Sequence, residues 1–282
     1  MTLRLNLFKA FDETSINDIW KAAFRSVGGD LEKSSLAITP EANFLLNIQR
    51  GRIPGHSIFT QLGHNEEVDT TADETIYEGA TTFIPLSIAE TINFSSDNVN
   101  DTFGGTGVQS LKFQGLDGNF NPITEIIATN GLTTVTTLSA FIILHRVDAE
   151  IADLTNIGTL NFFSTTTNKD MGLMRANLGS IQNGFFIVPI NKTAHIFRIA
   201  ASVTRTKGTQ GVKEANVNIL LKEDGKALKT FEFFGLRSDG GAIGLELPFN
   251  KIAEKTFVRA DALAIANNTA VSINFALILI DN

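Results

Sequence analysis

The sequence contains no cysteine, which excludes disulfide bonds and thiolate metal sites, so stability has to come from core burial or from assembly. It contains only one Trp and one Tyr, beside 22 Phe. Surfaces that bind sugars or single-stranded nucleic acid usually present Tyr and Trp, whereas Phe is mostly a core residue. The aromatic content therefore predicts cores and subunit contacts.

Positive charge is also scarce, because 23 Lys and Arg residues stand against 30 Asp and Glu residues, which gives a net charge of −7. This balance argues against a phosphate-binding surface, so we expect no nucleic-acid partner. No run reaches the length of about 18 apolar residues that a membrane span needs, so we expect no membrane insertion. The start, residues 1–13, alternates too strongly for the apolar core of a signal peptide.

One amphipathic helix is predicted at about 15–27, inside an N-terminal arm of residues 1–54. Ser15 and Asp18 have the spacing of a capping box, and Gly28 supplies a stop. A helix this short is marginal alone in water, so its apolar face has to dock, either on its own β body or on a neighbouring subunit. We predict an assembly interface formed by Ile16, Ile19, Trp20 and Phe24. A strand is expected later in the arm, at about 42–50.

An acidic connecting segment, residues 55–79, follows the break at Pro54. Such a run of carboxylates cannot bury itself without partners, so we expect it on a surface, solvated or paired with Arg and Lys. Binding of calcium through its oxygen ligands is the alternative. The predicted acidic surface residues are Glu66, Glu67, Asp69, Asp73 and Glu74.

The remainder of the chain is typical of β structure. Alternating apolar residues separated by turn signals about every 10 residues predict a first β-sandwich domain at 80–150. A weak break near Glu150 marks the boundary to a second, jelly-roll-like sandwich at 151–282. Its strands are expected at 159–164, 184–189, 194–204, 215–222, 228–234, 244–247, 256–264 and 270–280. The predicted fold is therefore mainly β: two antiparallel β-sandwich (jelly-roll-like) domains behind a short arm with one α-helix.

No motif for catalysis, cofactor binding or metal binding is present. None of the histidines (His56, His64, His145 and His195) lies within four residues of another, so a local metal site is not expected. The run from Asp117 to Asn121 begins like a calcium loop, but Pro122 and Ala128 stand where that loop needs Gly and Glu, so a hairpin turn is preferred. We expect no catalytic residue, no cofactor and no metal.

Three stretches share a pattern with known proteins: Gly55–Gly79, with its order GHSIFTQLGHNEEVDT and then IYEGA; Gly105–Asp117; and Val188–Ala194. Over about residues 50–210 the chain resembles a family of virion structural proteins of tailed bacteriophages, especially marine ones. The resemblance implies a virion component of the head-decoration, collar or tail type.

Together these observations predict a non-enzymatic virion structural protein, assembled in the host cytoplasm. Its expected partners are other virion proteins (capsid, portal, collar or tail subunits) and further copies of itself. A receptor- or glycan-binding adhesin is the alternative and would place Tyr or Trp on exposed loops; only Tyr77 and Trp20 are available. A polysaccharide depolymerase is a second rival and would bring carboxylates together in a cleft.

Overall fold

The computed structural model describes residues 40–79, 82–150, 155–206, 211–240 and 243–282. The chain separates into two compact units, Met1–Ile58 and Phe59–Asn282. The described part is mainly β, with one short helix and small antiparallel sheets, which confirms the predicted fold class at that level. The predicted helix at about 15–27 lies outside the described residues.

The described helix, α3 (Pro40–Gln49), occupies the place where the sequence predicted a strand at about 42–50, so that prediction is wrong. Pro40 stands at the first helical position, where its missing N–H costs nothing. Gly51, with φ of 67°, ends the helix in the left-handed conformation, and its N–H donates to the carbonyl of Ile48. The short apolar run around Phe44 fits a strand as well as a helix, so the boundaries at Pro40 and Gly51 were not recognised from the sequence.

Strands account for most of the described chain. Their bounds are β1 (His56–Asn65), β2 (Glu74–Thr75), β3 (Ile92–Ser96), β4 (Ser110–Leu116), β5 (Pro122–Ala128), β6 (Val135–Thr136), β7 (Ile143–Ala149), β8 (Leu160–Ser164), β9 (Asp170–Met174), β10 (Phe185–Ile187), β11 (Lys192–Arg205), β12 (Glu214–Lys222), β13 (Lys229–Arg237), β14 (Ile243–Ile252), β15 (Phe257–Ala264) and β16 (Thr269–Asp281). Every strand predicted after residue 159 is present within a few residues of its predicted bounds. The sequence missed β1, β2 and β9, which fall in polar or Gly-containing stretches.

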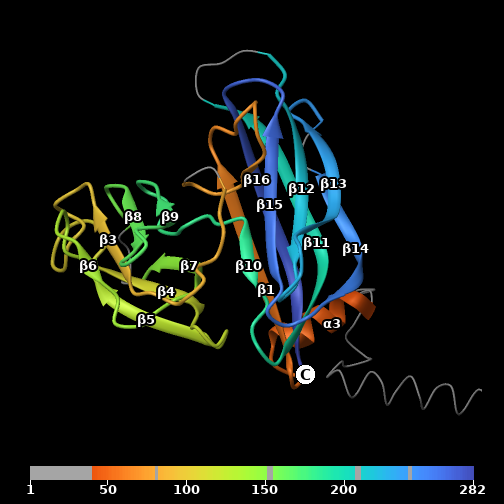
Figure 1. Ribbon diagram of the computed structural model, residues 1–282, viewed down its shortest axis with the longest axis horizontal. Helices are drawn as coiled ribbons and strands as arrows, with labels where there is room; N and C mark the ends of the chain where they lie inside the picture. Colours follow the sequence, from red (N-terminus) through yellow and green to blue (C-terminus); the bar gives the residue numbers. More distant parts are fainter. Residues whose placement is uncertain (1–39, 80–81, 151–154, 207–210, 241–242) are drawn as a thin grey trace, which may run out of the picture. The chain divides into compact units, whose positions relative to one another are not determined.

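Two of the sheets are built mostly from the C-terminal strands (Figure 1). The first has the order β1-β16-β11-β14, and the second has the order β10-β15-β12-β13, with β2 pairing β15 as well. The longest ladder joins β11 to β16, from Lys192 opposite Asp281 to Arg205 opposite Thr269. Because β16 lies beside both β1 and β11, the first and the last strand of the described chain pair in one sheet.

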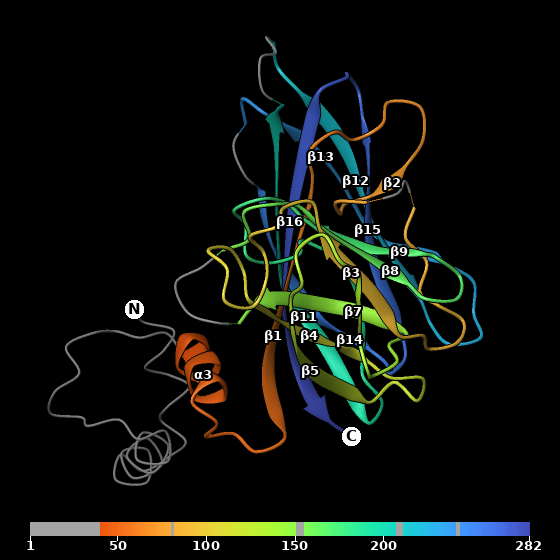
Figure 2. The ribbon, with the colours of Figure 1, turned by 90° about the vertical axis from the view of Figure 1, so that its left-hand side faces the viewer.

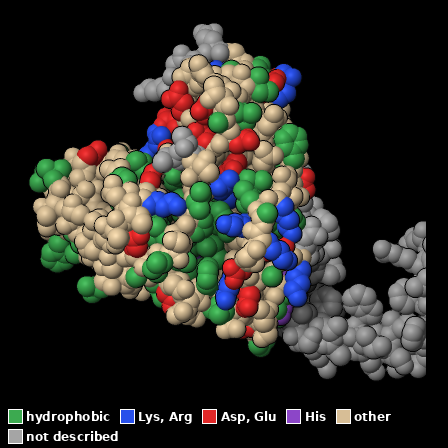
Figure 3. Space-filling view, viewed as in Figure 1, with side chains coloured by type: hydrophobic (Ala, Val, Ile, Leu, Met, Phe, Trp, Pro, Cys, Tyr) green, Lys and Arg blue, Asp and Glu red, His purple; other side chains and the backbone are tan. Residues whose placement is uncertain are grey.

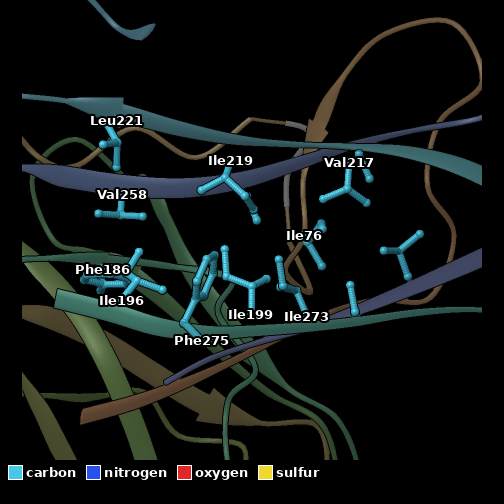
Figure 4. Packing of buried hydrophobic residues seen from close by; sticks show 14 of the residues in the cluster. Ile76, Phe186, Ile196, Ile199, Val217, Ile219, Leu221, Val258, Ile273 and Phe275 are labelled. Atoms are coloured by element: carbon cyan, nitrogen blue, oxygen red, sulfur yellow. The ribbon is translucent and has the colours of Figure 1, made fainter. Parts of the chain in front are cut away.

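These two sheets enclose a hydrophobic core (Figure 4). Ile199 and Phe275 point inward from the first sheet, and Ile219 and Val258 point inward from the second. All four side chains are fully buried. The alternation of buried and partly exposed residues along β12 is the period of two that the sequence displays.

The other two sheets have the orders β6-β3-β8-β9 and β5-β4-β7, and Figure 2 shows their strands facing the viewer. Their core is rich in Phe, as the composition predicted. Phe94, Phe113 and Phe162 pack with ring centroids 5.1–6.1 Å apart. The same cluster includes Phe185 and Phe257 of β10 and β15, so this core continues into the second sheet.

Strand pairing does not divide the chain where the sequence placed its boundaries. β8 and β9 follow residue 150, yet β8 pairs with β3, from Ile92 opposite Ser164 to Ser96 opposite Leu160. The segment 55–79 was expected to be a connector, but it contributes β1 and β2 to the C-terminal sheets. The physical reason is that a strand with an open edge pairs with whichever chain segment reaches it, and alternation alone does not identify that segment.

Candidate functional site

The acidic segment is only partly a surface feature. Glu67 and Asp73 are exposed, and Asp69 accepts hydrogen bonds from the backbone N–H and the hydroxyl of Thr71, which lower its pKa. Glu74, in contrast, is buried, accepts a hydrogen bond of 2.7 Å from Asn65, and has its pKa raised by burial. The expectation of an exposed carboxylate is therefore wrong for Glu74, because the pairing of β2 with β15 draws it inward.

A buried carboxylate ends the same segment. Glu78 is 6% exposed, and its Oε2 accepts a 2.6 Å hydrogen bond from Arg175. Arg175 also pairs with Glu66. Burial raises the pKa of Glu78 to about 7, while the guanidinium contact favours its ionised form. Arg175 thus neutralises two carboxylates of the acidic segment, which is the Arg-paired arrangement that the sequence favoured over calcium.

A serine and a histidine lie beside this ion-pair group, in a pocket of about 410 Å³. His64 Nδ1 is 2.8 Å from Ser272 Oγ, and His64 Nε2 is 3.6 Å from Glu78 Oε1. The order serine, imidazole, carboxylate is that of a hydrolase triad. However, 3.6 Å is too long for a hydrogen bond, and Glu78 is already held by Arg175. Ser272 lies within a strand ladder opposite Ser202 rather than on a sharp exposed turn, so the geometry does not support acyl transfer.

His145 has a defined structural role. It is 7% exposed on β7, and its Nε2 accepts a 3.1 Å hydrogen bond from the backbone N–H of Ile187. Its ring makes an edge contact with Phe59 at 5.5 Å. A protonated imidazole could not accept the Ile187 bond, so the fold requires the neutral form.

Acid is therefore expected to destabilise the protein through His145. Burial lowers its pKa from the ordinary 6.5 to about 4. The unfolded chain binds the proton first, so stability is complete above pH 6.5 and is lost as the pH falls toward 4. The loss should reach about 2 kcal/mol near pH 5. Chemical denaturation across this range should show that His145→Gln lacks this slope while His56→Gln keeps it; parallel curves for all three proteins would contradict the assignment.

Large apolar side chains are exposed on the part of the molecule that contains β3–β6, and Figure 3 shows several of them projecting there. Leu138 is 92% exposed and Phe103 is 71% exposed. We define the apolar loop surface as Val99, Phe103, Ile126, Leu132 and Leu138. Four of these residues lie on loops and Ile126 lies on β5, and exposed apolar side chains of this kind can form part of an interaction site.

A buried carboxylate positions one half of this surface. Asp101 is fully buried and accepts hydrogen bonds from the Ser96 hydroxyl at 2.6 Å and from the backbone N–H groups of Ile157 and Gly158 at 2.8 Å. It accepts a further bond from the N–H of Val108 at 3.1 Å. These bonds fix the loop that carries Val99 and Phe103. A separate backbone bond, from the N–H of Gly131 to the main-chain carbonyl of Asp101, joins this loop to the turn before Leu132.

An edge strand positions the other half. β5 has β4 on one side and no further strand on the other within the described sheet, and its Ile126 is 56% exposed. The carboxylate of Glu125, also on β5, accepts hydrogen bonds from the N–H groups of Leu138 and Ser139 at 2.8 and 2.7 Å. An open strand edge with apolar side chains is a natural place for another chain to associate.

The structure brings together a different set of residues from the predicted one. Ile16, Ile19, Trp20 and Phe24 lie outside the described residues. The sequence missed the apolar loop surface because an isolated exposed apolar residue in a loop looks like any core residue. Within the described ranges, no group of three or more His, Cys, Asp or Glu side chains is placed to hold a metal ion. No helix in the described part of the chain is long and apolar enough to cross a membrane.

Comparison with known proteins finds no family model and no curated protein that matches this chain.

Proposed function

We propose that this chain is a non-enzymatic structural protein of a tailed-bacteriophage virion, assembled in the host cytoplasm into the capsid exterior, the collar or the tail. The pattern over residues 50–210 supports the virion assignment. The apolar loop surface is the main support for the assembly role. Its side chains stay in contact with water in an isolated protein, whereas a partner would bury them.

We infer that the described body is built from two β-sandwich units, the larger of the jelly-roll type. The shared core between the β1-β16-β11-β14 and β10-β15-β12-β13 sheets supports this arrangement. A many-stranded body of this kind presents loops and sheet edges at fixed positions, which suits repeated contacts in a symmetric assembly. The N-terminal face of Ile16, Ile19, Trp20 and Phe24 is proposed as a second contact with neighbouring subunits.

A receptor- or glycan-binding adhesin is the alternative function. Such a protein would present Tyr or Trp on its loops, but Tyr77 is 2% exposed and packs against Phe83 and Phe185 in the core. Trp20 lies outside the described residues; within them, the alternative would have to use Phe103, which has no polar handle for a sugar hydroxyl. The burial of Tyr77 therefore favours the structural role.

Immunogold labelling of purified particles with an antibody to this chain tests the virion assignment. Labels at one repeated position on the head, collar or tail would support it. Absence of the chain from purified particles would contradict it.

The assembly role predicts that the double variant Phe103→Asp/Leu138→Asp self-associates more weakly than the wild type. Each buried Phe or Leu contributes about 1.5–3 kcal/mol, so the dissociation constant should rise by at least about 100-fold. Light scattering after size exclusion at two concentrations measures the change. The control is Ile265→Asp, because Ile265 is 62% exposed but lies outside the apolar loop surface. If the double variant and the control had the same mass in solution, the apolar loop surface would not be the assembly contact.

A further inference from the structure

A cleft of about 840 Å³ is lined by residues that do not belong to the apolar loop surface. One wall comes from the segment around Ile84 with Phe120, and the other comes from the hairpin between β12 and β13 and the start of β15. Its size falls within the range of small-molecule pockets, which are often found where two structural parts meet. Figure 3 shows hydrophobic side chains in the middle of this face with Lys and Arg side chains beside them.

The floor and walls of the cleft are mainly apolar. Ile84 is 54% exposed and Leu228 is 41% exposed, so the two walls present apolar surface to solvent toward the opening. The buried floor includes Leu86, Ile142, Ile187 and Phe257. The apolar part of a ligand bound here would be removed from water, together with the apolar side chains of both walls.

Cations are concentrated at the β15 side of the cleft. Lys222 is the Cα partner of Phe257, and Arg259 follows two residues later on the same strand, so these side chains share one face of the sheet. Lys255 lies over the ring of Phe120, with its Nζ 5.6 Å from the centroid. Among the described residues, neither Lys222 nor Lys255 forms an ion pair.

Arg259 provides a second, independent sign of a ligand. It is 7% exposed and lines the cleft. Its Nη1 donates to the carbonyl of Phe83 at 2.9 Å, and its Nη2 donates to Asp261 at 2.6 Å. Its Nε, however, is buried with no hydrogen-bond partner. An unused guanidinium donor in a buried position is costly and is ordinarily satisfied by an acceptor.

The carboxylates near the cleft do not cancel this positive charge. Glu223 pairs with Lys226 and Lys229, and Asp261 is engaged by Arg259 and by the hydroxyl of Thr75. Asp224 is exposed in the hairpin turn, next to Gly225. The positive charges of Lys222 and Lys255 therefore stay unpaired within the described residues, in a cleft whose floor is apolar.

We propose that this cleft binds a small amphipathic anion, that is, an apolar chain or ring carrying one carboxylate. The apolar body covers Ile84, Leu86 and Phe257, and the carboxylate pairs with Lys222 and Lys255 at the side where Arg259 Nε lacks an acceptor. The proposal is independent of the virion assignment, because it rests on the cleft alone.

Calorimetric titration of the full-length protein with three compounds that share one apolar tail tests the proposal. The compounds are decanoate, decanol and decyltrimethylammonium, each used below its micelle concentration. Decanoate should bind with one-to-one stoichiometry, more tightly than decanol, and decyltrimethylammonium should bind most weakly. Equal affinities for the three compounds, or no binding of decanoate, would overturn the proposal.

Substitutions locate the site. Lys222→Gln and Lys255→Gln should each weaken decanoate binding about fivefold, the upper range for an ion pair near the surface, and leave decanol binding unchanged. Ile84→Asp should abolish decanoate binding, because it places a carboxylate on the apolar wall. Lys251→Gln is the control, because Lys251 is exposed on β14 and does not line the cleft. Decanoate binding that all these variants retain at wild-type affinity would place the ligand elsewhere and overturn the proposal.

Discussion

Replacement of Asp101 by Ala is expected to lower the free energy of unfolding by about 4 kcal/mol, the largest effect of any substitution proposed for this protein. The carboxylate accepts four hydrogen bonds while fully buried, three of them from backbone N–H groups of Val108, Ile157 and Gly158. Without it, these N–H groups remain buried and unpaired, and each costs about 1–3 kcal/mol. Denaturant unfolding measures the loss.

Two further variants separate the hydrogen bonds from the simple loss of atoms. Asp101→Asn keeps the volume but replaces one acceptor oxygen with a donor, so it should still be clearly destabilised. Asp117→Ala removes a partly exposed carboxylate that accepts from the N–H groups of Asn119 and Asn121, and it should cost only about 1 kcal/mol. If Asp101→Ala lowered the free energy of unfolding no more than Asp117→Ala, the stabilising role assigned to the four Asp101 hydrogen bonds would be wrong.

Replacement of Gly184 by Ala is expected to cost about 3 kcal/mol, at the upper end for overpacking. A Cβ at this position would lie 2.4 Å from the carbonyl oxygen of Ile76. The backbone cannot move away, because the Gly184 N–H donates to that same carbonyl at 2.8 Å and the Gly184 carbonyl accepts from Ala260 at 2.9 Å. Gly63 lies at the same close approach of two chain segments, because a Cβ added at Gly63 would lie 2.4 Å from the Cα of Gly184.

Gly235→Ala is the matched control for this substitution. Gly235 also lies in a strand, β13, but its nearest neighbour would be the Asn216 side chain at an ordinary 3.8 Å. The control should change stability by no more than about 0.5 kcal/mol, measured by thermal and denaturant unfolding. Equal stabilities of the two variants would show that the chain crossing at Gly184 is loose.

Much of the secondary structure was predictable because it is encoded locally. The alternation along β11, β12, β15 and β16 has a period of two, and turn formers such as Asn268 separate the strands. The high Phe content likewise predicted aromatic cores, and Phe94, Phe113 and Phe162 form one. Where strong apolar residues sat between helix boundary signals, as in α3, the local pattern was ambiguous and the prediction failed.

The candidate sites were not predictable in the same way. Glu78 and Arg175 are 97 residues apart in the chain, yet they form an ion pair in which the carboxylate is buried. Lys222 and Arg259 share a cleft wall only because β12 pairs with β15. No sequence window contains both members of either pair, so no local pattern signals them.

The sequence by itself determined that the protein is mainly β, where most of its strands lie, and that its stability rests on packed apolar side chains without disulfides. Only the tertiary structure decided which strands pair, that Glu74 and Glu78 are buried, and that Lys222, Lys255 and Arg259 gather at one cleft. The physical reason is that alternation specifies which face of a strand is apolar but not which strand it meets. Which side chains are buried, and which charged side chains lie close together, depends on that partner strand. Both therefore follow only from the assembled sheets.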